Sequence, residues 1–324
     1  MQAFQLTRPA SLADALAAAN SDGARFIAGG TDLMQLLKDK VEAPSRLVDL
    51  ERVGLTRIST GPKGLRLEAM ARMSDVAAHP EVRAGWPAIA QALEASASPQ
   101  VRNMGTIGGN LLQRTRCGYF RDTGFACNKR EPGSGCPAIA GESRMLAILG
   151  GSDRCIATHA SDLAVALTAL DAVVELRGPG GTREVPLTEF YRLPAETPEV
   201  ETIMRPGELI TAVSVPADAA ARNSHYLKLR DRASFEFALV SVAVALEVQD
   251  GTLRTVRLAA GGVGTRPWRL PEVEAALRGQ AAGDAAFRQA AGHASDGAHP
   301  TRQNGFKQIL LQRAVLRSLQ NATA

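Results

Sequence analysis

The feature that most constrains this chain is the placement of its cysteines. All four, Cys117, Cys127, Cys136 and Cys155, fall within one glycine-rich stretch of a 324-residue sequence. A chain of this length buries a large core without covalent cross-links, so the grouping needs a local cause. Four thiolates are the ligand number of a structural zinc ion or of an iron–sulfur cluster.

The spacing between the cysteines does not select one of these centres. It reads C-x9-C, C-x8-C and C-x18-C, without the CxxC pair of a zinc ribbon or a simple ferredoxin. Two disulfides, in an exported protein, and four unlinked buried thiols are the alternatives. The segment PGSGC can bring backbone N–H groups close to sulfur, and nearby cations would offset the charge of a thiolate-ligated cluster: Arg114, Arg116, Lys129 and Arg130. The residues favour a cluster.

Composition excludes several other classes of protein. The chain is 45% hydrophobic and 22% charged, as in ordinary soluble proteins, and its length predicts two or three domains. Its net charge of +4 is spread along the chain and only 4% of residues are aromatic, so we expect no nucleic-acid partner. The apolar runs are too short for a membrane span, and the N-terminus lacks the apolar region of a signal peptide.

The first part of the chain, residues 1–55, has the pattern of a small parallel α/β unit. Ser11 caps a helix, a strand at 25–30 runs into a helix starting at Thr31 or Asp32, and a second strand covers 46–50.

In residues 56–217 the pattern of apolar and polar residues changes, and this change predicts a second subdomain. Alternating strands are followed by a helix capped by Ser74, a helix over 81–97 and a strand-like segment at 101–112. A helix then runs into a strand over 162–178, and another strand covers 208–216.

A third domain is predicted over 222–324, after a linker at 218–224. Asp250-Gly251 between two β-rich runs indicates a type I′ hairpin. Helices are expected near 271–278, 284–294 and 302–321, so this domain combines a small antiparallel sheet with helices.

Two glycine-rich loops are candidate ligand sites. The first glycine loop, residues 28–33 (AGGTDL), joins a strand to a helix and presents free backbone N–H groups that suit a phosphate. The second glycine loop, residues 103–110 (NMGTIGGN), suggests a bulged strand or a ligand lying against the backbone. Neither has the spacing of GxGxxG or of a P-loop. A tight turn explains the first loop alone, but the two together favour one large ligand held between two subdomains.

Taken in order, AGGTDL, VRNMGTIGGNL, SDLAVAL and YLKLRDR resemble the FAD-binding subunit of the molybdenum hydroxylases, over about residues 3–320. These are the xanthine dehydrogenases, carbon monoxide dehydrogenases and aldehyde oxidoreductases. The resemblance implies an α+β chain with a two-subdomain FAD-binding fold of the vanillyl-alcohol-oxidase/CO-dehydrogenase-flavoprotein type. A C-terminal α/β domain with a small antiparallel sheet would follow.

The segment 114–156, which we call the cysteine insert, narrows the resemblance to one group within the family. Most of the family passes directly from the second glycine loop to the Ser-Asp-Leu motif. The insert is similar to that of 4Fe–4S-carrying variants, above all the flavin subunit of bacterial periplasmic aldehyde oxidoreductase. It implies that one 4Fe–4S cluster is ligated by Cys117, Cys127, Cys136 and Cys155.

The resemblance also implies which residues bind FAD. The first glycine loop would contact the pyrophosphate through Ala28, Gly29, Gly30, Thr31, Asp32 and Leu33. The second would lie on its other side, through Thr106, Gly109 and Asn110.

Three further positions are implied near the flavin. Asp162 would bind the ribityl chain or the polar edge of the flavin, besides starting a helix. Ile210 would contact the isoalloxazine through its backbone, and Lys228 would be a fixed positive charge beside it. From the residues alone, Lys228 is equally an exposed lysine on a strand.

The function implied is electron transfer, with no catalytic side chain in this chain. A large molybdopterin subunit would oxidise an aldehyde, and a small 2Fe–2S subunit would pass electrons to FAD and on to an external acceptor. NAD is disfavoured as that acceptor, because Ser96 stands where NAD-using xanthine dehydrogenases carry an aromatic. We expect a heterotrimer, exported to the periplasm on a partner's signal or retained in the cytoplasm.

Three alternatives stay open. The chain could serve a xanthine dehydrogenase or a hydroxybenzoyl-CoA-reductase-type complex. It could be a self-contained flavin oxidase or reductase. It could also be a zinc-bound structural subunit that has lost redox function.

Overall fold

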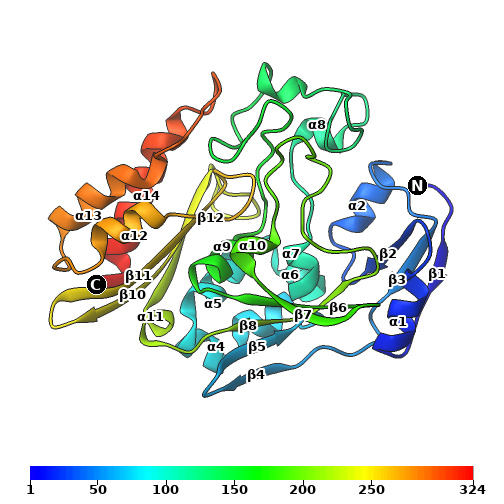
Figure 1. The fold of residues 1–324 in the computed structure, drawn as a ribbon, viewed down its shortest axis with the longest axis horizontal. Coiled ribbons are helices and arrows are strands. Elements are labelled where there is room, and N and C mark those ends of the chain that lie inside the picture. Colours follow the sequence, from blue (N-terminus) through cyan, green and yellow to red (C-terminus); the bar gives the residue numbers. More distant parts are fainter. Residues whose placement is uncertain (324) are drawn as a thin grey trace.

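The computed structural model describes residues 1–323, in which three β-sheets follow one another along the chain (Figure 1). The first sheet is parallel, with strand order β1-β3-β2. Its elements are β1 (Gln5–Thr7), α1 (Leu12–Ala19), β2 (Ala24–Ile27), α2 (Leu33–Lys38) and β3 (Arg46–Asp49). Ser11 caps α1 by accepting a hydrogen bond from the backbone N–H of Asp14 at 3.1 Å. The expected strand–helix–strand unit is confirmed, and β1 is added at its edge.

The second sheet is antiparallel, with order β4-β5-β8-β6-β7. Its strands are β4 (Ile58–Gly61), β5 (Gly64–Glu68), β6 (Val173–Gly178), β7 (Gly181–Pro186) and β8 (Leu209–Val215). The helices that share its core are α3 (Met73–Ala78), α4 (Pro80–Gly85), α5 (Pro87–Ala95), α7 (Ile107–Leu111), α9 (Asp162–Ala169) and α10 (Leu187–Phe190). The short helix α6 (Pro99–Met104) has no buried residue. Every residue of α9 is buried, because DLAVALTA is apolar almost all round and lies between α5 and the third sheet.

The third sheet is the antiparallel sheet expected near the C-terminus, with order β12-β11-β10-β9. Its strands are β9 (Ser224–Leu229), β10 (Val240–Gln249), β11 (Thr252–Gly261) and β12 (Trp268–Arg269). The turn between β10 and β11 has φ of 51° at Asp250 and 74° at Gly251, which confirms the type I′ hairpin. The helices that follow are α12 (Pro271–Leu277), α13 (Asp284–Ala291) and α14 (Phe306–Thr323), with a 3₁₀ turn at Gly292–Ser295.

Side-chain alternation along β10 explains how this sheet is covered on both faces. Val240, Val242 and Val244 belong to a core shared with α12, α13 and α14, whereas Ala243 and Ala245 face the core that contains α9. Small side chains on that second face let α9 approach the sheet closely. Figure 1 shows the C-terminal helices on the side of the sheet away from the other two sheets.

Several local expectations are wrong, for identifiable reasons. Pro87 divides the expected helix over 81–97 into α4 and α5, since proline starts a helix but cannot continue one. Residues 101–112 form no strand: Ser98 and Thr106 cap two short helices, α6 and α7, by accepting bonds from Val101 and Gly109 backbone N–H groups.

Two smaller corrections concern helix caps. Ser74 lies inside the first turn of α3, whose N-cap position is Arg72. The expected linker at 218–224 contains α11 (Ala219–Arg222), because the carboxylate of Asp218 caps it at 2.6 Å from the Ala221 N–H.

The cysteine insert has little regular structure beyond α8 (Gly118–Arg121) and a 3₁₀ turn at Pro137–Ile139. It lies at the top of Figure 1, between α2 and the C-terminal domain. On one side, Phe120 and the cysteines pack in a core that includes Leu36 of α2. On the other, the fully buried Lys307 donates to the carbonyls of Leu146 at 3.0 Å and Gly262 at 2.7 Å. Within residues 1–323, every helix is too short or too polar to cross a membrane.

Candidate cofactor-binding site

A cavity of about 1160 Å³ lies where the two glycine loops, the start of α9 and the strands β8 and β9 meet. It is larger than a pocket for a drug-sized molecule and suits a dinucleotide. Every residue predicted from the sequence to bind FAD lines it: Ala28, Gly29, Gly30, Thr31, Asp32, Leu33, Thr106, Gly109, Asn110, Asp162, Ile210 and Lys228. The structure therefore brings together positions that are up to 200 residues apart in the chain.

The two glycine loops touch directly at Gly29. A Cβ atom at this position would lie 1.8 Å from the carbonyl oxygen of Met104 and 2.6 Å from its carbon. Gly30 has φ of 68°, in the left-handed region that glycine adopts without strain. The first loop thus requires glycine at both positions: Gly29 for close approach, Gly30 for its backbone.

We expect Gly29→Ala to force the two loops apart. Overpacking of this kind lowers the free energy of unfolding by about 1–3 kcal/mol. Because the two loops would also lie further apart, the variant should lose FAD during purification. Gly61→Ala is the matched control, because its Cβ would meet no atom within 4 Å. Urea denaturation and the flavin-to-protein ratio measure the two effects; equal flavin content in both variants contradicts the role of the contact.

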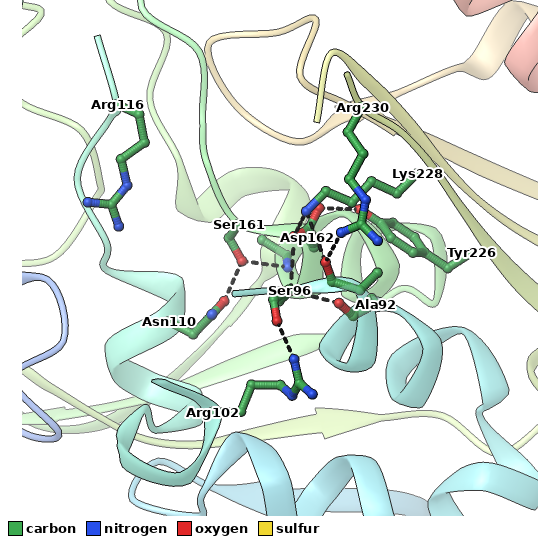
Figure 2. Close-up of polar contacts among 12 residues, drawn as sticks. Ala92, Ser96, Arg102, Asn110, Arg116, Ser161, Asp162, Tyr226, Lys228 and Arg230 are labelled. Atoms are coloured by element: carbon green, nitrogen blue, oxygen red, sulfur yellow. Dashed lines mark hydrogen bonds and ion pairs between the residues drawn. The ribbon is translucent and has the colours of Figure 1, made fainter. Parts of the chain in front are cut away.

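The second glycine loop is locked to the start of α9. The Thr106 hydroxyl accepts from the Gly109 N–H at 3.2 Å, which turns the loop into the first turn of α7. Asn110 accepts a hydrogen bond from the Ser161 hydroxyl at 2.5 Å, and Ser161 also caps α9 through the Ala164 N–H at 2.9 Å (Figure 2).

Asp162, the first residue of α9, is 7% exposed and its carboxylate is fully engaged within the protein. One oxygen accepts from the Tyr226 hydroxyl at 2.5 Å; the other accepts from Ser96 at 2.9 Å and Lys228 at 2.8 Å (Figure 2). Burial, followed by the charge of Asp162, raises the pKa of Tyr226 well above its usual value, so it stays a donor. Asp162 therefore shapes the cavity wall by holding its neighbours.

Lys228 is not the exposed lysine of the alternative interpretation. Its side chain is 3% exposed, and its ammonium bonds the Ala95 carbonyl at 3.1 Å in addition to Asp162. Arg230 donates to the same carbonyl at 3.0 Å, and Arg102 donates to the carbonyl of Ser96 at 2.7 Å. These cations satisfy the free carbonyls at the C-terminal end of α5, where positive charge is favourable.

Sequence reasoning missed Tyr226, Arg102 and the structural role of Ser96. The motif YLKLRDR held a usable signal: Tyr226 and Lys228 alternate along β9 and so point to one face, and Arg230 follows directly after the strand. Ser96 is nearly buried because it bonds Asp162, which explains a serine at this position.

Ile210 is buried near the start of β8, beside an irregularity in the ladder. Leu176 pairs with Ile210, whereas Glu175 pairs with Ala212, so one residue of β8 is left over. The bulge bends the strand where it borders the cavity.

Asp32 binds the first residues of the cysteine insert. Its carboxylate accepts from Arg116 at 2.5 Å, from Arg121 at 2.7 Å and from the Arg114 backbone N–H at 2.8 Å. Burial alone would raise the pKa of Asp32, but the two guanidinium groups hold it below its usual value. The carboxylate of Asp32 therefore orders the groups around the first glycine loop, and the expected contact of this residue with a pyrophosphate stays a prediction.

The cysteine insert brings its four thiols to one place. Cys117, Cys127, Cys136 and Cys155 line a single small void, and none is in a disulfide. Cys136 is half-buried and the others are buried. No three His, Cys, Asp or Glu side chains within residues 1–323 are arranged to hold a single metal ion.

Backbone N–H groups point at the sulfurs, but they come from segments outside the expected PGSGC stretch. Those of Phe120 and Tyr119 approach Cys117, and that of Ala157 lies 3.5 Å from the sulfur of Cys155. Burial raises the pKa of Cys155 to about 11, so a bound cationic centre is needed to keep it a thiolate. Of the cations expected to offset cluster charge, Arg114 and Arg116 instead line the large cavity.

The two sites are joined by the segment 155–162. Cys155 lies at one end and Asp162 at the other. His159, between them, lines both the large cavity and a second cavity of about 340 Å³ that Cys155 also borders. Burial lowers the pKa of His159 to about 4, so the ring is neutral near pH 7.

Comparison with known proteins agrees with this geometry. Residues 2–218 match the FAD binding domain in molybdopterin dehydrogenase, and residues 225–322 match the CO dehydrogenase flavoprotein C-terminal domain. The chain is 47% identical to the aldehyde oxidoreductase FAD-binding subunit of Escherichia coli, over 100% of this chain and 99% of the relative. It is 29% identical to the glyceraldehyde dehydrogenase medium chain of Sulfolobus acidocaldarius, over 92% and 89%.

Solved structures show the same fold. A chain of carbon monoxide dehydrogenase from Hydrogenophaga pseudoflava superposes with a TM-score of 0.78 at 26% identity, covering 99% of this chain and 98% of that one. Quinoline 2-oxidoreductase from Pseudomonas putida gives 0.75 at 25% identity, covering 100% and 99%. The cavity built by two glycine loops, the antiparallel C-terminal domain and these matches together establish that the chain belongs to the FAD-binding medium subunits of the molybdenum hydroxylase family.

Proposed function

We propose that this chain is the FAD- and 4Fe–4S-binding electron-transfer subunit of a heterotrimeric molybdenum-containing aldehyde oxidoreductase. Its partners would be a large molybdopterin subunit and a small 2Fe–2S subunit. Electrons would reach FAD from those partners and leave to an external acceptor. The observation that carries the proposal is the convergence of four free thiols on one void beside a dinucleotide-sized cavity.

The residues present suit FAD. The backbone N–H groups of the first glycine loop, where Gly29 admits close approach, would hold the pyrophosphate. Thr106, Asn110 and Ile210 also line the cavity, and Lys228 lines it as the buried ion-pair partner of Asp162. When bound, FAD supplies the exchange between two-electron and one-electron transfer. The chain contributes binding, orientation and electrostatics, and we assign no general acid or base.

The residues of the insert suit a cluster better than a zinc ion. A zinc ion draws four ligands to about 2.3 Å from one point, whereas a 4Fe–4S cluster is held by thiolates bound to separate iron atoms. Four thiols around a common void, with N–H groups directed at sulfur, suit a larger inorganic centre. The zinc-bound structural alternative is therefore the less favoured.

Aldehydes are the proposed substrate class, because the relative with 47% identity is an aldehyde oxidoreductase subunit. The substrate itself would bind the large partner. Periplasmic location, by co-export with a signal-bearing partner, is proposed from the resemblance of the insert, with the cytoplasm as the alternative.

Isolation of the native complex without oxygen tests the proposal. We expect three different subunits, FAD in a one-to-one ratio to this chain, and more iron and acid-labile sulfide than the 2Fe–2S subunit alone holds. The isolated chain should be inactive on aldehydes. Zinc in place of the extra iron, or aldehyde oxidation by the chain alone, would refute it.

A further inference from the structure

The structure places an arginine of the cysteine insert in the wall of the FAD cavity. Arg116 precedes the first cysteine of the insert and lines the same large cavity as the first glycine loop and Asn110. Figure 2 shows the side chains of Arg116 and Asn110. We propose that Arg116 binds the diphosphate of FAD, so that the cysteine insert supplies the cation that the glycine loops lack.

The glycine loops cannot supply this charge themselves. Neither residues 28–33 nor residues 103–110 contain a lysine or arginine, and the first loop carries the negative charge of Asp32. Backbone N–H groups alone would have to offset two phosphate charges next to a carboxylate.

The insert reverses this balance. Arg116 and Arg121 both bond Asp32, so this group carries a net positive charge at the start of α2. Arg114, the other guanidinium at the root of the insert, is already paired with Glu42 and Glu201. Within the insert, the positive charge that is not offset by a carboxylate beside the cavity therefore belongs to the Arg116–Arg121–Asp32 group.

Arg116 is oriented before any ligand binds. One terminal nitrogen donates to Asp32 and the other to Gln113 at 3.3 Å. The ring of Phe237, from the C-terminal domain, lies 4.9 Å from the guanidinium carbon. A guanidinium has five N–H donors; these contacts use two, and Nε has no partner. The side chain is 24% exposed, so donors remain for a phosphate.

Arg121 offers a matched control. It bonds the same Asp32 oxygen at 2.7 Å and the carbonyl of Thr115 at 2.9 Å. Among the described residues it is not part of the cavity lining, whereas Arg116 is. Loss of Arg121 disturbs the Asp32 group without removing a donor from the cavity.

The test is FAD binding by the full chain in its complex, stripped of FAD and followed by quenching of flavin fluorescence. Arg116→Gln should raise the FAD dissociation constant about tenfold to a hundredfold, the range for a charge-assisted hydrogen bond. Arg116→Lys keeps the positive charge but loses the paired donors of the planar guanidinium. Its FAD dissociation constant should therefore lie between those of the wild type and of Arg116→Gln. Arg121→Gln removes charge from the Asp32 group but no donor from the cavity, so it should raise the FAD dissociation constant less than Arg116→Gln does.

Ligands that lack part of FAD locate the contact. ADP, which keeps the diphosphate, should lose affinity for Arg116→Gln in parallel with FAD, whereas riboflavin should bind both proteins equally. Unchanged FAD affinity, an equal loss in Arg121→Gln, or an equal loss for riboflavin would overturn the assignment. If Arg116→Gln does not fold, Arg116→Lys takes its place. A loss of ADP affinity without a loss of riboflavin affinity in that variant then supports the assignment, and an equal effect on both ligands overturns it.

This inference rests on FAD binding by the chain and not on the 4Fe–4S cluster. Iron content is read separately from flavin affinity in the same samples. A complex without the extra iron would refute the proposed function while leaving the Arg116 result standing.

Discussion

Cys127→Ser should abolish the iron that we propose this subunit holds and leave FAD bound. Cys127 is one of four thiols around a common void, and a serine oxygen is a poor ligand for an iron–sulfur cluster. Iron, acid-labile sulfide and the broad visible absorbance of the cluster should fall to the level contributed by the 2Fe–2S partner. Metal analysis and absorbance spectra of the anaerobically purified complex measure this.

Ser134→Ala is the control for that experiment. The Ser134 hydroxyl accepts a hydrogen bond from the backbone N–H of Cys127 at 3.0 Å, so its removal disturbs the same turn and keeps every thiol. Iron should be retained in this variant. Unchanged iron in Cys127→Ser, or equal loss in both variants, rejects Cys127 as a ligand.

Breaking the buried pair between Asp162 and Lys228 should cost about 3–5 kcal/mol of unfolding free energy, because the remaining charge is left buried without a partner. Their side chains are 7% and 3% exposed, and the pair joins α9 to β9 of the C-terminal domain. Asp162→Asn and Lys228→Met should each show this loss in urea denaturation of the full chain. The double variant should lose less than the sum of the two.

Arg230→Met is the matched control for the pair. Arg230 bonds the same Ala95 carbonyl as Lys228 but has no carboxylate partner, so its loss should cost about 1 kcal/mol. Additive effects in the double variant, or a similar cost for all three single variants, would show that the charge pair is not the source of the stability.

The sequence predicts local structure correctly where a single residue determines the backbone conformation. Ser11 caps α1 with its own hydroxyl, and Asp250-Gly251 turns β10 into β11 because both residues tolerate positive φ. Short helices were misread at 101–112, since three glycines lower helix propensity and only the Ser98 and Thr106 caps reveal the helices. Pro87 likewise marks a break that the alanine-rich pattern conceals.

By itself, the sequence determined the identity of the family, the grouping of the thiols along the chain and twelve of the residues that line the cofactor cavity. Those depend on motifs whose backbone requirements are local, such as the positive φ of Gly30. Only the tertiary structure decided what the charged residues do. Asp162 faces Lys228, and Asp32 faces Arg116, across distances in sequence that no periodicity encodes, because a charge acts through whichever partner folding brings within a few ångströms.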